Sequence, residues 1–141
     1  MRREIYAAEV SFRGAPGHDE ESPYIAALNL SSTLVRAGHY TEATSFLRQQ
    51  MREATRVLGA ENSNTLKLCA TLAQTFYTDP RSSPDKLREA VEIMERTVRT
   101  TRRVFGGAHP MTRHMQKDLA NARMRMEARA VGVLEKLHAP K

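Results

Sequence analysis

The side chains able to perform acid–base, nucleophilic or metal chemistry are few and scattered in this sequence. Its five histidines are His18, His39, His109, His114 and His138. His109 and His114 are five residues apart, so they point to different faces of a helix, which argues against a shared metal ion. The glycine-rich phosphate loop, the nucleophile elbow and the zinc-binding helix motif are all absent. We therefore expect no enzyme activity, no metal site and no cofactor.

The single cysteine, Cys69, excludes an intrachain disulfide and a cysteine-based zinc site. Its place in an apolar helix favours a buried, inert thiol over a nucleophile. We expect a reducing, cytoplasmic compartment, and no apolar run approaches the roughly 20 residues of a membrane span. The acidic residues 19–21 precede an expected helix start, where the helix dipole favours negative charge, so we prefer that role to metal binding.

The positive charge is concentrated in the second half of the chain. Residues 1–85 contain 9 Lys and Arg and 10 Asp and Glu, whereas residues 86–141 contain 13 and 6, for a net charge of +6 overall. Such a region attracts acidic partners. A well-hydrated helix face explains it equally well, and both interpretations stay open.

Nucleic-acid binding is one alternative use of this charge. Four arginines follow the spacing of one helix face, and three more extend the basic region: Arg96, Arg99, Arg102 and Arg103, then Arg123, Arg125 and Arg129. Most of the eight aromatic residues occupy expected core positions, which leaves few for base stacking. Three glutamates, Glu89, Glu92 and Glu95, can also pair with the arginines along the helix. We therefore prefer a protein partner.

The sequence repeats itself at a long period. Residues 29–31 recur 42 residues later at 71–73 and again 47 residues later at 118–120, and residues 57–65 recur at 104–112. A helix pair that cannot bury its apolar face alone must stack on a copy of itself, and a repeat of this length is typical of such stacking. Proteins of this kind mostly bind other proteins.

The helix signals predict six helices and no strands. Proline follows serine at Ser22 and Ser83, a cap-plus-proline start, and glycines at 38, 59 and 106–107 mark helix ends. A break at 78–83 lengthens the second period by five residues. The expected helices span residues 3–13, 22–37, 41–58, 64–77, 84–105 and 110–137.

The chain resembles the tetratricopeptide repeats of kinesin light chain type over residues 16 to 125. The resemblance rests on a His-Pro-x-Thr element at 109–112, a partial copy of it at 62–66, and an Asn-Leu to Gly-x-Tyr-x-Glu-Ala element at 29–43. It implies a right-handed superhelical solenoid of antiparallel helix pairs. The first helix of each pair lines a concave groove that binds peptides or helices.

We expect one domain over residues 1–141, with about two and a half to three repeats and a long C-terminal helix. Its parts are an orphan helix of a preceding repeat at 1–15, repeat 1 at 16–59, repeat 2 with the insertion at 60–106, the first helix of repeat 3 at 107–125, and a capping extension at 126–141. The resemblance implies that helices approach closely at Ala43, Ala90 and Ala120. It implies core roles for Leu30, Leu34, Tyr40, Leu72, Phe76 and Leu119.

The groove register follows from the family's groove asparagine, which is present at Asn29 and replaced by Thr71 and Asp118. Steps of three and four around these positions predict a peptide-binding groove, with Asp118 and Tyr77 or Thr78 on the same face. The groove residues are Asn29, Ser32, Arg36, Lys67, Thr71, Gln74, His114, Lys117, Asn121 and Arg125. These side chains are mostly basic or amide-bearing, so we expect an acidic peptide or partner helix as the ligand.

Self-association is a further alternative. The last helix carries apolar residues at steps of three and four, which fits a cap on the stack or an association surface. An unpaired first helix and this long last helix could exchange or stack between copies, so the chain could be a self-assembling scaffold or a homodimer through its terminal helices.

Overall fold

The computed structural model describes residues 22–138, with side chains described over 23–132. The five helices of this part are α2 (Ser22–Arg36), α3 (Tyr40–Leu58), α4 (Ser63–Thr78), α5 (Pro84–Phe105) and α6 (Pro110–His138), with no strand among the described residues. The prediction of an all-α helical repeat fold is confirmed, and its right-handed superhelical path stays a prediction. The helix expected at 3–13 lies outside the described residues.

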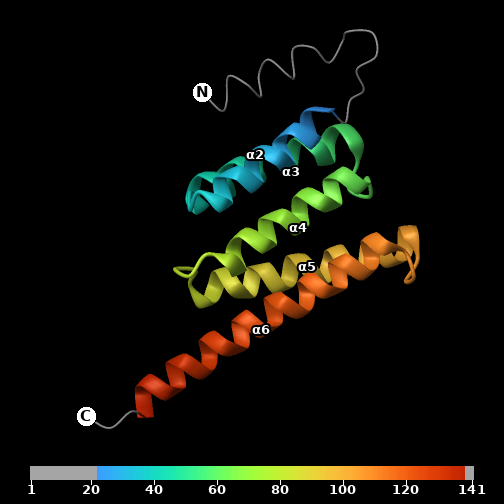
Figure 1. Cartoon of the computed structure of the whole chain (residues 1–141). Coiled ribbons are helices and arrows are strands. Elements are labelled where there is room, and N and C mark those ends of the chain that lie inside the picture. The colour runs from blue at the N-terminus through green and yellow to red at the C-terminus, as the bar shows by residue number, and fades with distance from the viewer. Residues whose placement is uncertain (1–21, 139–141) are drawn as a thin grey trace. The chain divides into compact units, whose positions relative to one another are not determined.

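The chain divides into two compact units, Met1–Leu72 and Ala73–Lys141, and the division falls within α4. In the first unit α2 packs on α3 (Figure 1). Leu34 on α2 and Leu47 on α3 are both buried. Gly38 ends α2 with a φ of 82°, a conformation that only glycine adopts at low cost. The N–H of His39 reaches the carbonyl of Leu34 at 2.8 Å, which closes the helix in a Schellman motif.

The 47-residue period is visible in two turns that match bond by bond. Gly59 and Gly106 end α3 and α5 with φ values of 92° and 91°. Three residues later, Asn62 and His109 each accept a hydrogen bond from the backbone N–H two positions on, at 2.8 and 3.0 Å. Asn62 thus replaces the histidine of the His-Pro element and performs the same capping contact. The His-Pro element and its partial copy therefore mark the starts of α6 and α4.

In the second unit, α5 and α6 run antiparallel and pack along their length (Figure 1). Ser83 caps α5 by accepting a hydrogen bond from the N–H of Lys86 at 3.2 Å, as the cap-plus-proline signal predicts. The core of this pair includes Met94 on α5 with Met115 and Ala122 on α6, each at most 2% exposed. Arg123 on α6 lies 3.2 Å from Glu95 on α5, so the pairing of charges runs between helices there rather than along one.

The expected close-approach positions are confirmed only in part. Ala43 and Ala90 are completely buried, whereas Ala120 is exposed, so that prediction is wrong. The residues matching Ala120 in the earlier pairs, Ser31 and Ala73, are also completely buried. The reason is that α6 continues straight past this point to His138 and does not turn back to cover its own face.

The expected core is confirmed at four of its six positions. Leu34, Leu72, Phe76 and Leu119 are all buried. Leu30 and Tyr40 are only half-buried. Cys69, expected to be buried, is also half-buried. Within the described part of the chain, no helix is both long enough and apolar enough to cross a membrane.

Candidate functional site

The predicted groove residues fall in both units. In the first unit Asn29, Ser32, Arg36 and Lys67 are exposed, while Thr71 is half-buried and donates its hydroxyl to the carbonyl of Lys67 at 2.8 Å. In the second unit all five predicted residues are exposed: Gln74, His114, Lys117, Asn121 and Arg125. Whether the two sets form one groove stays a prediction.

The second unit gathers several of these residues around a buried tyrosine at the end of α4. Tyr77 is 8% exposed, and its hydroxyl donates to Oδ1 of Asp118 on α6 at 3.4 Å. Oδ2 of Asp118 lies 3.5 Å from Nε2 of His114, one turn back on the same helix. Asn121 also hydrogen-bonds the Tyr77 hydroxyl. The predicted groove face of α6 therefore carries an organised polar cluster.

Burial sets the protonation of this cluster. It raises the pKa of Tyr77 to about 12, and the neighbouring Asp118 charge adds to the shift. Burial also raises the pKa of Asp118 above its usual value, while His114, Tyr77 and Lys117 act in the opposite direction. The cluster therefore works as a neutral phenol beside a carboxylate whose charge is costly to bury.

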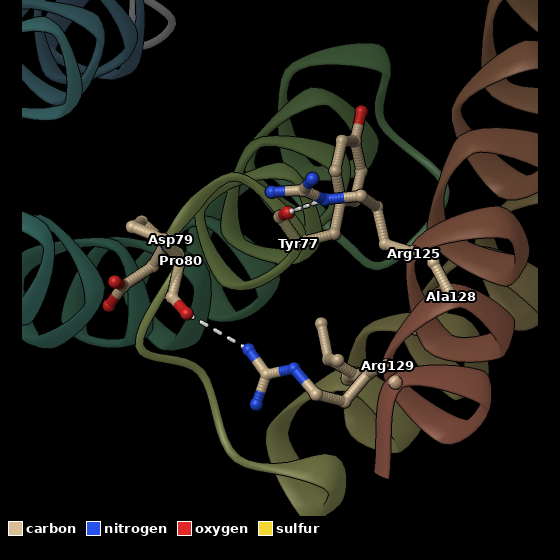
Figure 2. A pocket seen from close by; sticks show the side chains of 8 residues that line it. Tyr77, Asp79, Pro80, Arg125, Ala128 and Arg129 are labelled. Atoms are coloured by element: carbon tan, nitrogen blue, oxygen red, sulfur yellow. Dashed lines mark hydrogen bonds between the residues drawn. The ribbon is translucent and has the colours of Figure 1, made fainter. Parts of the chain in front are cut away.

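Two arginines of α6 bind backbone carbonyls, one in the last turn of α4 and one in the loop that follows it. Arg125 donates its Nε hydrogen to the carbonyl of Tyr77 at 2.8 Å, and Arg129 donates from Nη2 to the carbonyl of Pro80 at 2.9 Å (Figure 2). The carbonyls of a helix C-terminus lack helical partners and carry partial negative charge, which favours cations there. Arg125, predicted as a peptide-binding cation, thus also has a structural role.

A hollow of about 360 Å³ lies beside these two arginines, and we call it the α4–α6 hollow. Figure 2 shows Arg125, Ala128 and Arg129 reaching it from α6, opposite Asp79 and Pro80 of the loop. The lining residues are Tyr77, Asp79, Pro80, Leu87, Arg125, Ala128, Arg129 and Gly132. Small side chains on α6 leave the space open, while apolar groups and cations both reach its surface.

The loop after α4 is held in place by local hydrogen bonds. The carboxylate of Asp79 accepts from the backbone N–H of Arg81 at 2.9 Å and lies 3.4 Å from its Nε. Ser82 donates its hydroxyl to the carbonyl of Phe76 at 2.5 Å. Because Arg81 partly balances Asp79, Arg125 and Arg129 leave the hollow with a positive surface.

Two features of this site were not predicted from the sequence. Arg129 is not among the predicted groove residues, yet it turns toward the end of α4 together with Arg125, while Arg123 pairs with Glu95 on α5. The role of Pro80 as an acceptor also went unnoticed. The four-residue spacing of Arg125 and Arg129, together with the five-residue insertion in the facing loop, was the available signal.

The site carries hydrogen-bond donors and apolar surface. Among the residues that the structure describes, no group of three His, Cys, Asp or Glu side chains lies close enough to hold a metal ion. The guanidinium groups present planar N–H donors suited to carboxylates. The arrangement can therefore bind an anionic group and an adjoining apolar one.

The stretches of the chain that match a known family coincide with the observed helices. Residues 26–64 and 85–110 match the family model described as tetratricopeptide repeat. The first stretch covers most of α2, all of α3 and the following turn, and the second covers α5 and the turn into α6. No significant match was found among curated proteins or solved structures. The family matches support a tetratricopeptide repeat protein, and the kinesin light chain type stays a prediction.

Proposed function

Since two stretches of the chain match the tetratricopeptide repeat, whose general role is protein–protein interaction, we propose that the chain is a non-catalytic cytoplasmic module that binds an acidic peptide. The resemblance to kinesin light chain repeats supports a ligand that lies along the first helices of the pairs. Its partner would be a protein segment that presents carboxylates, either extended or as a helix. No cofactor enters this function.

One observation carries the proposal: two arginines flank an open hollow that has apolar surface. Arg125 and Arg129 each use one N–H group to bond a backbone carbonyl. A guanidinium has five N–H donors, so further donors remain on each side chain. The remaining donors suit a carboxylate. Leu87 and Pro80 supply apolar surface for a neighbouring side chain of the ligand.

The wider surface has the same character. Lys117, Asn121 and Gln74 are exposed on the predicted groove face of the second unit. Amide side chains pair well with an extended peptide backbone, and the lysine adds positive charge. A ligand with an acidic residue beside an apolar one fits this set of groups.

The test fills the hollow without disturbing the fold. A Cβ built at Gly132 meets nothing within 4 Å, so Gly132→Leu places a side chain in open space and also improves helix propensity. Ala130→Leu is the matched control because Ala130 is exposed on α6 and does not line the hollow. Both variants should keep the helicity of the wild type.

Binding is measured by fluorescence anisotropy with a labelled library of acidic peptides that each carry one central leucine. We expect binding that weakens with salt, drops about tenfold in Gly132→Leu, which corresponds to about 1.4 kcal/mol, and is unchanged in Ala130→Leu. Peptides with lysine in place of the acidic residues should not bind. Equal affinity of Gly132→Leu and wild type would remove the hollow from the binding surface.

A further inference from the structure

A second face of α6, separate from the hollow, exposes apolar side chains in a line. Ala120, Met124 and Val131 follow one another at steps of four and seven, which puts them on one side of the helix, and we call them the outer stripe. Met124 is 64% exposed and Val131 is 52% exposed. The buried residues Met115 and Ala122 lie on the other side, against α5.

The repeat pattern shows what normally covers this face. Ala120 stands where the two earlier pairs have Ser31 and Ala73, and both of those residues are completely buried. In the first unit the face around Ser31 belongs to the helix that packs on α3. Because α6 runs on as one helix through His138, nothing in the described part of the chain turns back over the outer stripe. The outer stripe is therefore equivalent to a helix face that is covered in the two earlier pairs.

The size of the contacting residues limits how closely a covering helix can approach α6. Ser31 on α2 and Ala43 on α3 are both small and completely buried. Small side chains at such positions let two helix backbones come close together. A helix covering Ala120 at a similar distance would need a small residue at its own centre and larger apolar residues toward Met124 and Val131.

The charges beside the outer stripe set the polarity of its partner. Arg113 and Lys117 lie at its N-terminal end and are exposed, and Glu127 is the exposed acidic residue within it. Arg123 lies to one side, where Glu95 of α5 already pairs with it. The uncompensated charge along this face is therefore positive, so acidic flanks on a partner would be attracted and basic ones repelled.

We propose that the outer stripe docks an amphipathic helix of a partner protein, with a small residue opposite Ala120, apolar residues over Met124 and Val131, and acidic residues on both flanks. This surface acts as the first helix of a pair whose second helix is supplied by the partner. The inference does not depend on peptide binding in the α4–α6 hollow, because the α6 residues that line the hollow, Arg125, Ala128, Arg129 and Gly132, are not part of the outer stripe. Lys117 borders both the predicted groove face and the outer stripe.

The experiment uses the complete 141-residue chain and a designed probe. The probe is a labelled helical peptide with leucines at steps of three and four, one central alanine and glutamates on both flanks. A matched peptide carries lysines in place of the glutamates. Fluorescence anisotropy should show binding of the acidic helix only, and the double variant Met124→Glu, Val131→Glu should weaken it by about tenfold or more.

The matched control is Ile25→Glu, which places the same charge at an exposed apolar residue of α2. We expect Ile25→Glu and Gly132→Leu to bind the acidic helix as the wild type does, which separates this surface from the hollow. Unchanged affinity in the double variant, equal binding of the lysine peptide, or no binding by the wild type would each overturn the proposal. Light scattering that shows a dimer lost in the double variant would also overturn it, since a second copy would then cover the stripe.

Discussion

Arg125 donates its Nε hydrogen to the backbone carbonyl of Tyr77 at 2.8 Å and so joins α6 to the last turn of α4 across 48 residues of sequence. This contact satisfies a carbonyl that the helix itself leaves without a partner. It also fixes the guanidinium at the edge of the α4–α6 hollow. One side chain thereby supports the fold of the second unit and shapes the surface proposed to bind peptide.

Replacing this arginine should destabilise the second unit. Arg125→Ala removes a charge-assisted hydrogen bond and a cation at a helix C-terminus, so we expect a loss of about 1 kcal/mol in the free energy of unfolding. Urea unfolding followed by circular dichroism measures the loss. Arg113→Ala is the control, because the exposed Arg113 side chain has no hydrogen bond or ion pair within the described residues. Equal losses in the two variants would contradict a structural role for Arg125.

The turn between α5 and α6 should depend on one glycine and not on its neighbour. Gly106 has a φ of 91° and a ψ of 156°, a region that side chains strongly disfavour, so Gly106→Ala should cost about 1–3 kcal/mol. Gly107 has no such φ, and a Cβ there meets nothing within 4 Å. We therefore expect Gly107→Ala to be neutral or slightly stabilising. Thermal unfolding of the two variants distinguishes them, and similar melting temperatures would count against the turn geometry.

Asp118 should make the fold less stable as the pH rises through its pKa. Burial raises the pKa of this carboxyl in the folded state, so the folded protein holds the proton more tightly than the unfolded chain does. The stability that this provides is present below the unfolded pKa and is lost as pH rises through the folded pKa. Asp118→Asn stays neutral and can still bond the Tyr77 hydroxyl, so we expect the variant to be more stable than wild type at neutral pH.

The test is the free energy of unfolding of wild type and Asp118→Asn, measured from pH 3 to pH 7. This range spans the usual carboxyl pKa of about 3.9. The advantage of Asp118→Asn should shrink toward the acidic end, where the wild-type carboxyl is already protonated. A variant that is less stable than wild type at neutral pH would show that the charge of Asp118 is favourable here, through His114 and Lys117.

Tyr77 should lose its phenol proton at a higher pH than an ordinary tyrosine. Its pKa is raised to about 12 by burial and by the Asp118 charge, above the ordinary value of 10.0. Since the folded pKa lies above the unfolded one, this phenol contributes stability that is lost as pH rises from about 10 through 12. Ultraviolet absorbance titration should show one phenol ionising near pH 12, and Tyr77→Phe should remove that step. A titration in which the step persists in the variant would assign it to another tyrosine.

The sequence by itself determined the helices of the described part. The expected spans 41–58 and 64–77 differ from Tyr40–Leu58 and Ser63–Thr78 by one residue at some ends, and 84–105 is reproduced as Pro84–Phe105. These boundaries depend on local chemistry: a glycine that adopts positive φ, a serine that caps, and a proline in a first turn. The 47-residue period likewise predicted that Asn62 and His109 occupy equivalent places, because each caps its own helix with its own side chain.

Only the tertiary structure determined which residues of α6 are buried and which are exposed. Periodicity placed Arg123, Arg125 and Arg129 in one basic region, yet the packing of α6 against α5 and the end of α4 sends them to different partners. The same packing buries Asp118 and leaves Ala120 exposed although the repeat predicted a close approach there. A helical register gives the face on which a side chain lies, but only the neighbouring elements determine whether that face meets a helix, a carbonyl or water.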